Sequence, residues 1–131
     1  MPRDNALVGG QMKPYVDVLG TRYKIEIRKF EEDSYMVSNG FEGYCSEDDK
    51  LIVVADPKSV TNAVYLTETE EQNRVKSILR HELIHAFLNE SGLSACASVF
   101  GNAWAKNEEM IDWIAIQFPK ILEAYKWCEC L

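Results

Sequence analysis

Apolar residues recur every three or four positions between Thr67 and Gly92, which is the spacing of one buried face of an α-helix. Thr67 is followed three residues later by Glu70, and this pair has the form of a capping box at a helix N-terminus. Gly92 is a typical residue just beyond a helix C-terminus. The pattern predicts a helix over residues 68–91, with an apolar face formed by Val75, Ile78, Leu79, Leu83, Ala86 and Phe87.

Shorter apolar patterns in the first half of the chain predict β-strands. Residues 23–27 alternate apolar and charged side chains, as a half-buried strand does. Leu51 to Ala55 is a continuous apolar run that ends before Pro57, which makes it the strongest strand candidate. Residues 35–37 and 41–45 are two further candidates. The acidic segment before Leu51 predicts a turn, so we expect the last two strands to form a hairpin.

The two ends of the chain carry weaker patterns. Residues 1–19 contain Gly and Pro and show no period, so we expect a loosely ordered lead-in. A second helix is expected over residues 103–117, and Pro119 predicts the start of a final short helix that ends near residue 127. We therefore expect a single domain, residues 1–131, of the α+β class: a small, mainly antiparallel sheet packed on two or three helices.

Charge and hydropathy narrow the possible partners. The net charge is -7, whereas a nucleic-acid-binding protein needs a basic patch that neutralises phosphates. The first twenty residues lack the apolar stretch of a signal peptide, and the longest apolar run, Leu51 to Ala55, is far shorter than a membrane span. We expect a cytoplasmic protein with no nucleic-acid partner and no membrane partner. The pattern favours no particular oligomeric state.

The four cysteines, Cys45, Cys96, Cys128 and Cys130, are too few and too scattered to predict a disulfide framework. Free thiols are therefore expected. A metal site at Cys128 and Cys130 would need Cys45 or Cys96 to complete it, and nothing in the spacing brings those residues there.

The predicted helix carries His81-Glu82-Leu83-Ile84-His85. Residues four apart on a helix lie above one another, so the rings of His81 and His85 can reach one tetrahedral ion. Glu82 lies about 100° round the helix from His81, where it can take a proton from a metal-bound water. The neighbouring residues are mostly apolar, which disfavours an ordinary surface helix. Two unpaired histidines and a glutamate buried there would be costly without a metal or partners to satisfy them.

The chain has two histidines, so a third ligand has to be another residue type. Glu90 lies five residues after His85, about 140° round the helix by its spacing, which makes it a poor ligand. The segment Asn107 to Asp112 on the next predicted helix is the candidate that remains. Glu108 and Asp112 share a face of that helix, so one can bind the metal while the other accepts the free ring N–H of a ligand histidine.

These residues resemble the signature of gluzincin-type zinc metallopeptidases, HExxH on one helix and Asn-Glu-x-x-x-Asp on the next. The likeness covers residues 78–115. In its short length and in the sequence around HExxH, the chain also resembles minimal zincin domains of phages and prophages. It resembles the ImmA/IrrE-like regulatory peptidases more loosely.

The resemblance implies a Zn²⁺ ion bound by His81, His85 and Glu108, with Glu82 as general base and Asp112 behind a ligand histidine. Glu109 stays open as an alternative third ligand. Glu108 is favoured over it because Glu108 shares its face with apolar residues of the predicted helix. Family resemblance also implies that an edge strand beside the active-site helix binds an extended peptide, and Leu51 to Ala55 is the candidate for that strand.

The expected activity is hydrolysis of peptide bonds in a peptide or protein substrate. The metal lowers the pKa of its bound water, and Glu82 removes the proton and passes it to the leaving amine. Tyr44, Tyr65 and Arg80 are candidates for stabilising the oxyanion, although a structural role suits each of them as well. The alternative function is a zinc-binding regulatory or interaction protein of the same fold without significant catalysis. A third hypothesis, an accidental HExxH in a structural protein, requires that the purified protein carries no stoichiometric zinc.

Overall fold

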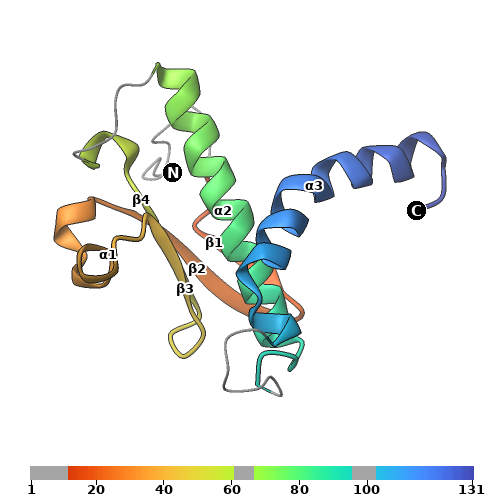
Figure 1. Ribbon diagram of the computed structural model, residues 1–131, viewed down its shortest axis with the longest axis horizontal. Helices are drawn as coiled ribbons and strands as arrows, with labels where there is room; N and C mark the ends of the chain where they lie inside the picture. Colours follow the sequence, from red (N-terminus) through yellow and green to blue (C-terminus); the bar gives the residue numbers. More distant parts are fainter. Residues whose placement is uncertain (1–11, 61–66, 96–102) are drawn as a thin grey trace.

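The computed structural model describes residues 12–60, 67–95 and 103–131. These residues form a four-stranded mixed sheet with the long helix α2 (Glu68–Glu90) across one face and the short helix α1 (Ser34–Asn39) on the other (Figure 1). A third helix, α3 (Glu108–Trp127), begins beside the C-terminal end of α2 and then projects away from the sheet. The predicted α+β class is confirmed.

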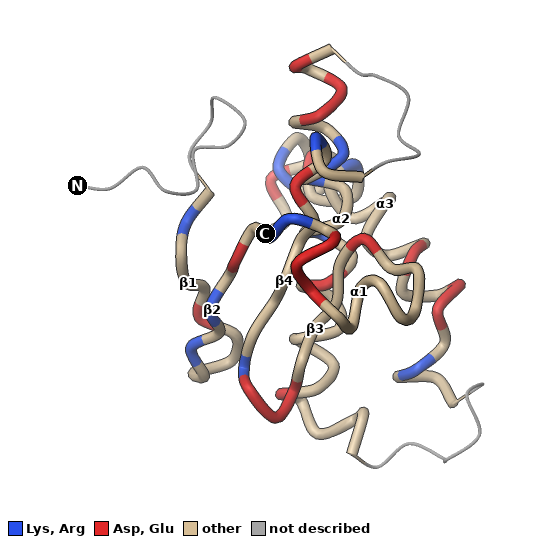
Figure 2. The backbone as a smooth tube through the Cα atoms, turned by 90° about the vertical axis from the view of Figure 1, so that its left-hand side faces the viewer, with Lys and Arg blue, Asp and Glu red and all other residues tan. Residues whose placement is uncertain are grey.

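The strands are β1 (Tyr15–Val18), β2 (Thr21–Arg28), β3 (Gly43–Ser46) and β4 (Leu51–Ala55), in the spatial order β1-β2-β4-β3. Strands β1 and β2 pair antiparallel, as do β3 and β4, while β2 and β4 pair parallel at the centre. The predicted hairpin of β3 and β4 is confirmed, and its turn carries acidic residues (Figure 2). Strand β3 runs opposite to β2, so the hairpin turn returns β4 parallel to β2.

Two predictions for the N-terminal half are wrong. Residues 35–37 form part of α1 and not a strand. The side chain of Asp33 accepts a hydrogen bond from Met36 N, and Gly40 ends the helix in the left-handed region at φ 70°. These two caps favour one helical turn over the β-propensity of the residues between them. The lead-in is also shorter than expected, because Tyr15–Val18 pairs with β2, and residues 1–11 lie outside the described part of the chain.

Helix α2 agrees with its prediction to within one residue. The capping box is present: Thr67 Oγ1 accepts from Glu70 N at 3.1 Å, and Glu70 Oε1 accepts from Thr67 N at 2.8 Å. Gly92 follows the helix with φ 87°. Local chemistry at both ends therefore fixes the length of this helix.

Helix α3 differs from its prediction at both ends. It starts at Glu108, where the side chain of Asn107 caps it by accepting from Met110 N at 2.8 Å, and a separate 3-10 turn (Trp104–Lys106) precedes it. The predicted break at Pro119 is wrong, because the helix continues through it. Proline removes one helical hydrogen bond and crowds the carbonyl four residues earlier, which a long helix accommodates by bending.

Three apolar clusters hold these elements together. Alternate residues of β4 face opposite sides, so that Ile52 and Val54 pack against α2 whereas Val53 and Ala55 pack against α1. A third cluster, Leu88, Ala105 and Ile111, joins α2 to the start of α3. This last cluster brings the acidic first turn of α3 to the histidines of α2.

Charged residues are spread over most elements. Lys and Arg lie on several strands and helices and do not gather in one place, while acidic residues are prominent at the β3–β4 turn and at the start of α2 (Figure 2). In the described part of the chain, no helix combines the length and the apolar character that crossing a membrane requires.

Candidate metal centre

The candidate centre lies between the C-terminal half of α2 and the first turn of α3. His81 and His85 lie one helical turn apart on α2, and their rings are about three quarters buried. Glu108 is the first residue of α3. Ile111, which is fully buried against α2, holds that turn in place.

Three donor groups converge there at closely similar distances. The two Nε2 atoms of His81 and His85 are 3.2 Å apart. Glu108 Oε1 lies 3.3 Å from His81 Nε2, and Glu108 Oε2 lies 3.4 Å from His85 Nε2. Tetrahedral zinc with bonds of about 2.0–2.1 Å separates its donors by roughly 3.3 Å. The three side chains are therefore spaced as the ligands of one such ion.

Asp112 determines which nitrogen of His81 faces this point. Its Oδ1 lies 2.7 Å from His81 Nδ1, and a carboxylate can only accept, so the ring proton sits on Nδ1. In the neutral form of this ring the lone pair is then on Nε2, the atom that faces His85 and Glu108. A carboxylate behind a ligand histidine fixes its tautomer in this way.

Burial also favours a neutral ring at His85. Loss of solvent lowers its pKa, and the charge of His81 acts in the same direction, while the carboxylate of Glu108 opposes them. A neutral imidazole with a free lone pair is the form that binds a metal.

Glu82 is buried, with 7% of its surface exposed, and lies beside the centre. The pKa of Glu82 is raised to about 7, mainly by burial; His81 opposes this shift, and the charges of Glu108 and Asp112 contribute to it. Its side chain reaches toward β3: a Cβ added at Gly43 would lie 3.6 Å from Glu82 Oε2. Glu82 therefore stands between the histidines and the edge of the sheet.

Gly43 allows α2 to approach β3 closely. A Cβ at this position would lie 2.5 Å from Ile78 Cγ2 and 3.0 Å from the carbonyl oxygen of Val53. Both distances are shorter than ordinary van der Waals contact, so any larger residue displaces the helix or the strand. We did not predict this role, which depends on a contact between segments far apart in the chain. A glycine inside a strand is the one sign of it in the sequence.

Two hollows meet at the centre. The larger, about 860 Å³, is bordered by residues 40–43, by α2 between Glu70 and Glu82, and by the first half of α3. The smaller, about 390 Å³, is bordered by α1, β3 and His85. Phe41, Gly43, His81, Glu82 and Glu108 line both. Together the hollows form a groove that crosses the candidate centre.

The strand that borders this groove is β3, one of the two edge strands of the described sheet. The prediction that Leu51 to Ala55 forms this edge is wrong, because β4 lies between β2 and β3. Strand β4 carries apolar residues on both faces, which is typical of an interior strand.

The outward groups of β3 follow from its register. Ala55 N donates to Glu42 O at 2.9 Å, and bonded pairs alternate along antiparallel strands. The backbone groups of Tyr44 therefore face β4. Those of Gly43 and Cys45 point to the open side.

The remaining acidic candidates lie elsewhere. Glu108 and Glu109 are both exposed, but in the described part of the chain the group that could hold a metal contains Glu108 and not Glu109. Glu90 Oε2 accepts from Tyr23 Oη and from Lys50 Nζ, each at 2.7 Å, and the hydrogen bond from Lys50 is the main cause that lowers its pKa to about 2. Glu90 thus ties α2 to the sheet.

The oxyanion candidates are placed as follows. The hydroxyl of Tyr44 donates to Asp33 Oδ2 at 2.7 Å and accepts from Arg28 at 3.1 Å, so it already has two partners. Arg80 is exposed and lines the larger hollow. Tyr65 lies outside the described residues.

The three cysteines in the described part of the chain do not join the centre as donors. Cys45, Cys128 and Cys130 are free thiols, and Cys96 lies outside the described residues. Burial raises the pKa of Cys45 to about 12, so this thiol stays protonated at neutral pH. Cys128 and Cys130 are exposed at the end of α3.

Comparison of the chain with protein-family models, with curated proteins and with solved structures gives no match. The likeness to zinc metallopeptidases accordingly rests on the residues of α2 and α3.

Proposed function

We propose that this protein is a zinc-dependent metallopeptidase with a minimal zincin-like fold of the gluzincin type. The observation that carries the proposal is the convergence of His81, His85 and Glu108 at 3.2–3.4 Å, with Asp112 at 2.7 Å behind His81. Imidazole and carboxylate are donors that zinc prefers, and three protein ligands leave one position open, as in catalytic zinc sites. Bound zinc supplies a water of lowered pKa and polarises a carbonyl group.

The protein's own residues supply proton transfer and hold the ligands in position. Glu82 borders both hollows beside His81, so it is placed to accept a proton from water and to return it to the leaving amine. Asp112 holds the ring of His81 in its orientation. The metal ligand Glu108 comes from a different helix, so the centre is complete only when α3 is docked.

An extended peptide is the substrate that the groove favours. The outward backbone groups of Gly43 and Cys45 can pair with a peptide strand, which adds main-chain hydrogen bonds at the open edge of the sheet. This places the peptide beside Glu82, since the carboxylate lies close to Gly43. The free thiols of Cys128 and Cys130 suit the reducing cytoplasm, which we propose as its compartment.

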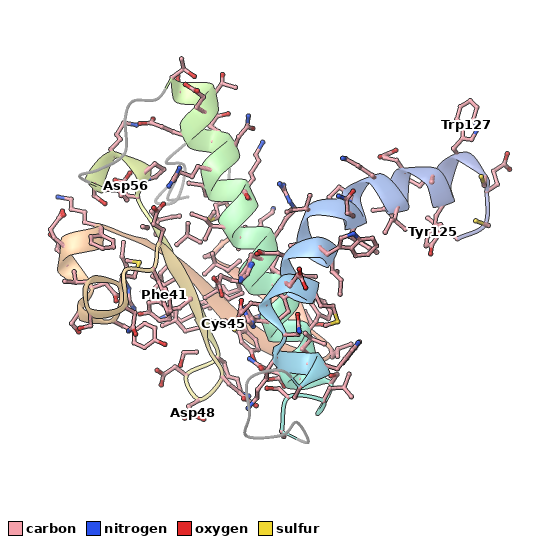
Figure 3. All side chains as sticks on the ribbon, in the orientation of Figure 1. Phe41, Cys45, Asp48, Asp56, Tyr125 and Trp127 are labelled. Carbon is pink, nitrogen blue, oxygen red and sulfur yellow. The ribbon has the colours of Figure 1, made fainter. Side chains whose placement is uncertain are left out.

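A second candidate function is a zinc-binding regulatory or interaction protein of the same fold without significant catalysis. The second half of α3 favours it, because Phe118, Tyr125 and Trp127 are exposed there, with 46%, 46% and 87% of their surfaces accessible. Tyr125 and Trp127 lie on the part of α3 that projects from the sheet (Figure 3). Exposed aromatic residues are enriched in protein interfaces.

Hydrolysis of a quenched fluorescent peptide library separates the two functions. A peptidase cleaves the library when loaded with zinc, stops when a chelator is added, and recovers when zinc is restored. The Glu82→Gln variant should bind zinc and lose turnover, because its amide cannot accept the proton. A zinc-loaded wild type that cleaves no peptide would favour the interaction function, and a Glu82→Gln variant as active as the wild type would refute the role of Glu82.

A further inference from the structure

Three aromatic rings form one wall of the smaller hollow: Tyr35 from α1, Phe41 from the following loop, and Tyr44 from β3. The ring centroid of Tyr35 lies 4.7 Å from that of Tyr44 and 6.0 Å from that of Phe41. In Figure 3, Phe41 follows α1 and Cys45 lies between the sheet and α2. The wall therefore stands within the same small hollow as the candidate metal centre.

This wall offers apolar surface that the chain itself leaves open. Tyr35 and Phe41 are 50% and 46% exposed. The hydroxyl of Tyr44 is held by Asp33 and Arg28, so its ring is fixed. Tyr35 packs against the other two rings in tilted pairs, so the chain's own contacts assemble the wall as a preformed surface.

Among the described residues that line this hollow, the charged ones all belong to the centre itself. Its other lining residues are the three aromatic residues, Gly43 and the protonated thiol of Cys45. The larger hollow differs, because Arg74, Arg80 and Glu70 line it, and Arg74 pairs with Glu42 at 2.8 Å through two nitrogens. The smaller hollow is therefore the apolar part of the groove.

We propose that the smaller hollow is a subsite for an aromatic or large aliphatic side chain of the substrate, on the residue next to the bond that is cleaved. The inference rests on the proposed function. Tyr35 and Phe41 supply the contact surface, and the adjacent centre fixes which residue of the peptide enters. The ligand class is a peptide with a Phe, Tyr, Leu or similar residue at that position.

Amino-acid hydroxamates test the subsite without knowledge of the substrate, because the hydroxamate binds zinc and places its side chain beside the metal. Affinities of phenylalanine hydroxamate and glycine hydroxamate are measured by calorimetry on the full-length zinc-loaded protein. Since one methylene in an apolar pocket gives about 10-fold discrimination or more, we expect the phenylalanine compound to bind at least about 10-fold more tightly. Tyr35→Ala should reduce this ratio to about threefold or less, because it removes the central ring of the wall.

Two control variants separate the ring from other effects. Tyr35→Phe keeps the ring and should keep the ratio. Tyr125→Ala removes a tyrosine of similar exposure on α3 that does not line the hollow, and it should also keep the ratio. Circular dichroism and bound zinc, measured on each variant, exclude loss of the fold.

The outcomes distinguish this inference from the proposed function. Equal binding of both hydroxamates to the zinc-loaded wild type overturns the subsite and leaves the metal centre standing. An unchanged ratio in Tyr35→Ala overturns it as well. Absence of bound zinc, with no affinity for either hydroxamate, overturns the proposed function and the subsite together.

Discussion

Adjacent glutamates on the first turn of α3 provide a sharp test of the metal centre. The structure brings Glu108 to within 3.3 Å and 3.4 Å of the two histidine Nε2 atoms, while Glu109 is exposed outside the group. Glu108→Gln and Glu109→Gln each remove one negative charge at the same helix terminus. Their effects on the helix dipole are therefore similar, about 0.3–1 kcal/mol. Any difference in zinc binding between the two variants then reports ligation.

The expected difference is large. Loss of a group behind a metal ligand weakens binding about 10–100-fold, so loss of a charged ligand should cost at least about 100-fold, or about 2.7 kcal/mol. With free zinc at about 100 times the wild-type Kd, zinc stabilises the wild type by about 2.7 kcal/mol. At that zinc concentration the Glu108→Gln variant gains only about 0.4 kcal/mol.

Thermal unfolding measures this directly. One kcal/mol shifts the Tm of a chain of this size by about 4 °C. Zinc should therefore raise the Tm of the wild type and of Glu109→Gln by about 10 °C, and that of Glu108→Gln by about 2 °C. Zinc content after gel filtration gives an independent measure on the same samples. A zinc effect lost in Glu109→Gln and kept in Glu108→Gln would refute the geometry, and an effect kept in both would exclude either carboxylate as a ligand.

Three further predictions concern the surroundings of the centre. Asp112→Asn should lower zinc affinity about 10–100-fold in a competition titration, because the hydrogen bond to His81 weakens; an unchanged affinity would show that the ring needs no such support. Gly43→Ala should destabilise the fold by about 1–3 kcal/mol in urea unfolding, because its Cβ would lie 2.5 Å from Ile78, whereas a neutral effect would mean that the helix shifts freely. Glu90 has a folded pKa of about 2 and an unfolded pKa of about 4.3, so its stabilising effect is present above pH 4.3 and is lost as the pH falls toward 2. The difference in Tm between the wild type and Glu90→Gln should accordingly narrow over that pH range, and a constant difference would contradict the reasoning.

The part of the site that lies on one helix could be predicted from the sequence. His81, Glu82 and His85 owe their relative positions to helical geometry, and the cap residues Thr67 and Gly92 mark the ends of that helix. Short-range rules therefore suffice for this half of the centre. The structure brings Glu108 and Asp112 to the same point, although their contact with α2 depends on tertiary packing through Ile111. That part was expected from a motif and not from local geometry.

Features that depend on long-range order could not be predicted in this way. Hydrophobic patterning identified β4 as a strand but gave no information on its neighbours, so it was assigned to the edge that β3 occupies. The aromatic wall joins Tyr35 and Tyr44, which belong to different elements, and Tyr35 itself was expected in a strand. Helix α3 is a case in which a local rule gave the wrong prediction. Proline prefers the start of a helix, but the capped and packed segment before Pro119 outweighs that preference and the helix continues.

Under the proposed function, docking of α3 and binding of the metal are linked. Helix α3 meets the rest of the domain through the small cluster of Leu88, Ala105 and Ile111, and its second half leaves the body of the molecule (Figure 1). Glu108 and Asp112 approach opposite nitrogens of the same ring, that of His81, so a displacement of α3 disturbs both contacts at once. An ion that binds the docked arrangement more tightly than the undocked one therefore stabilises docking. The gain in docking free energy equals the difference between the two binding free energies of the ion. Glu108 and Asp112 lie in the first turns of α3, on either side of Ile111 in the sequence. The residue that docks the helix and the residues of the candidate centre therefore move together.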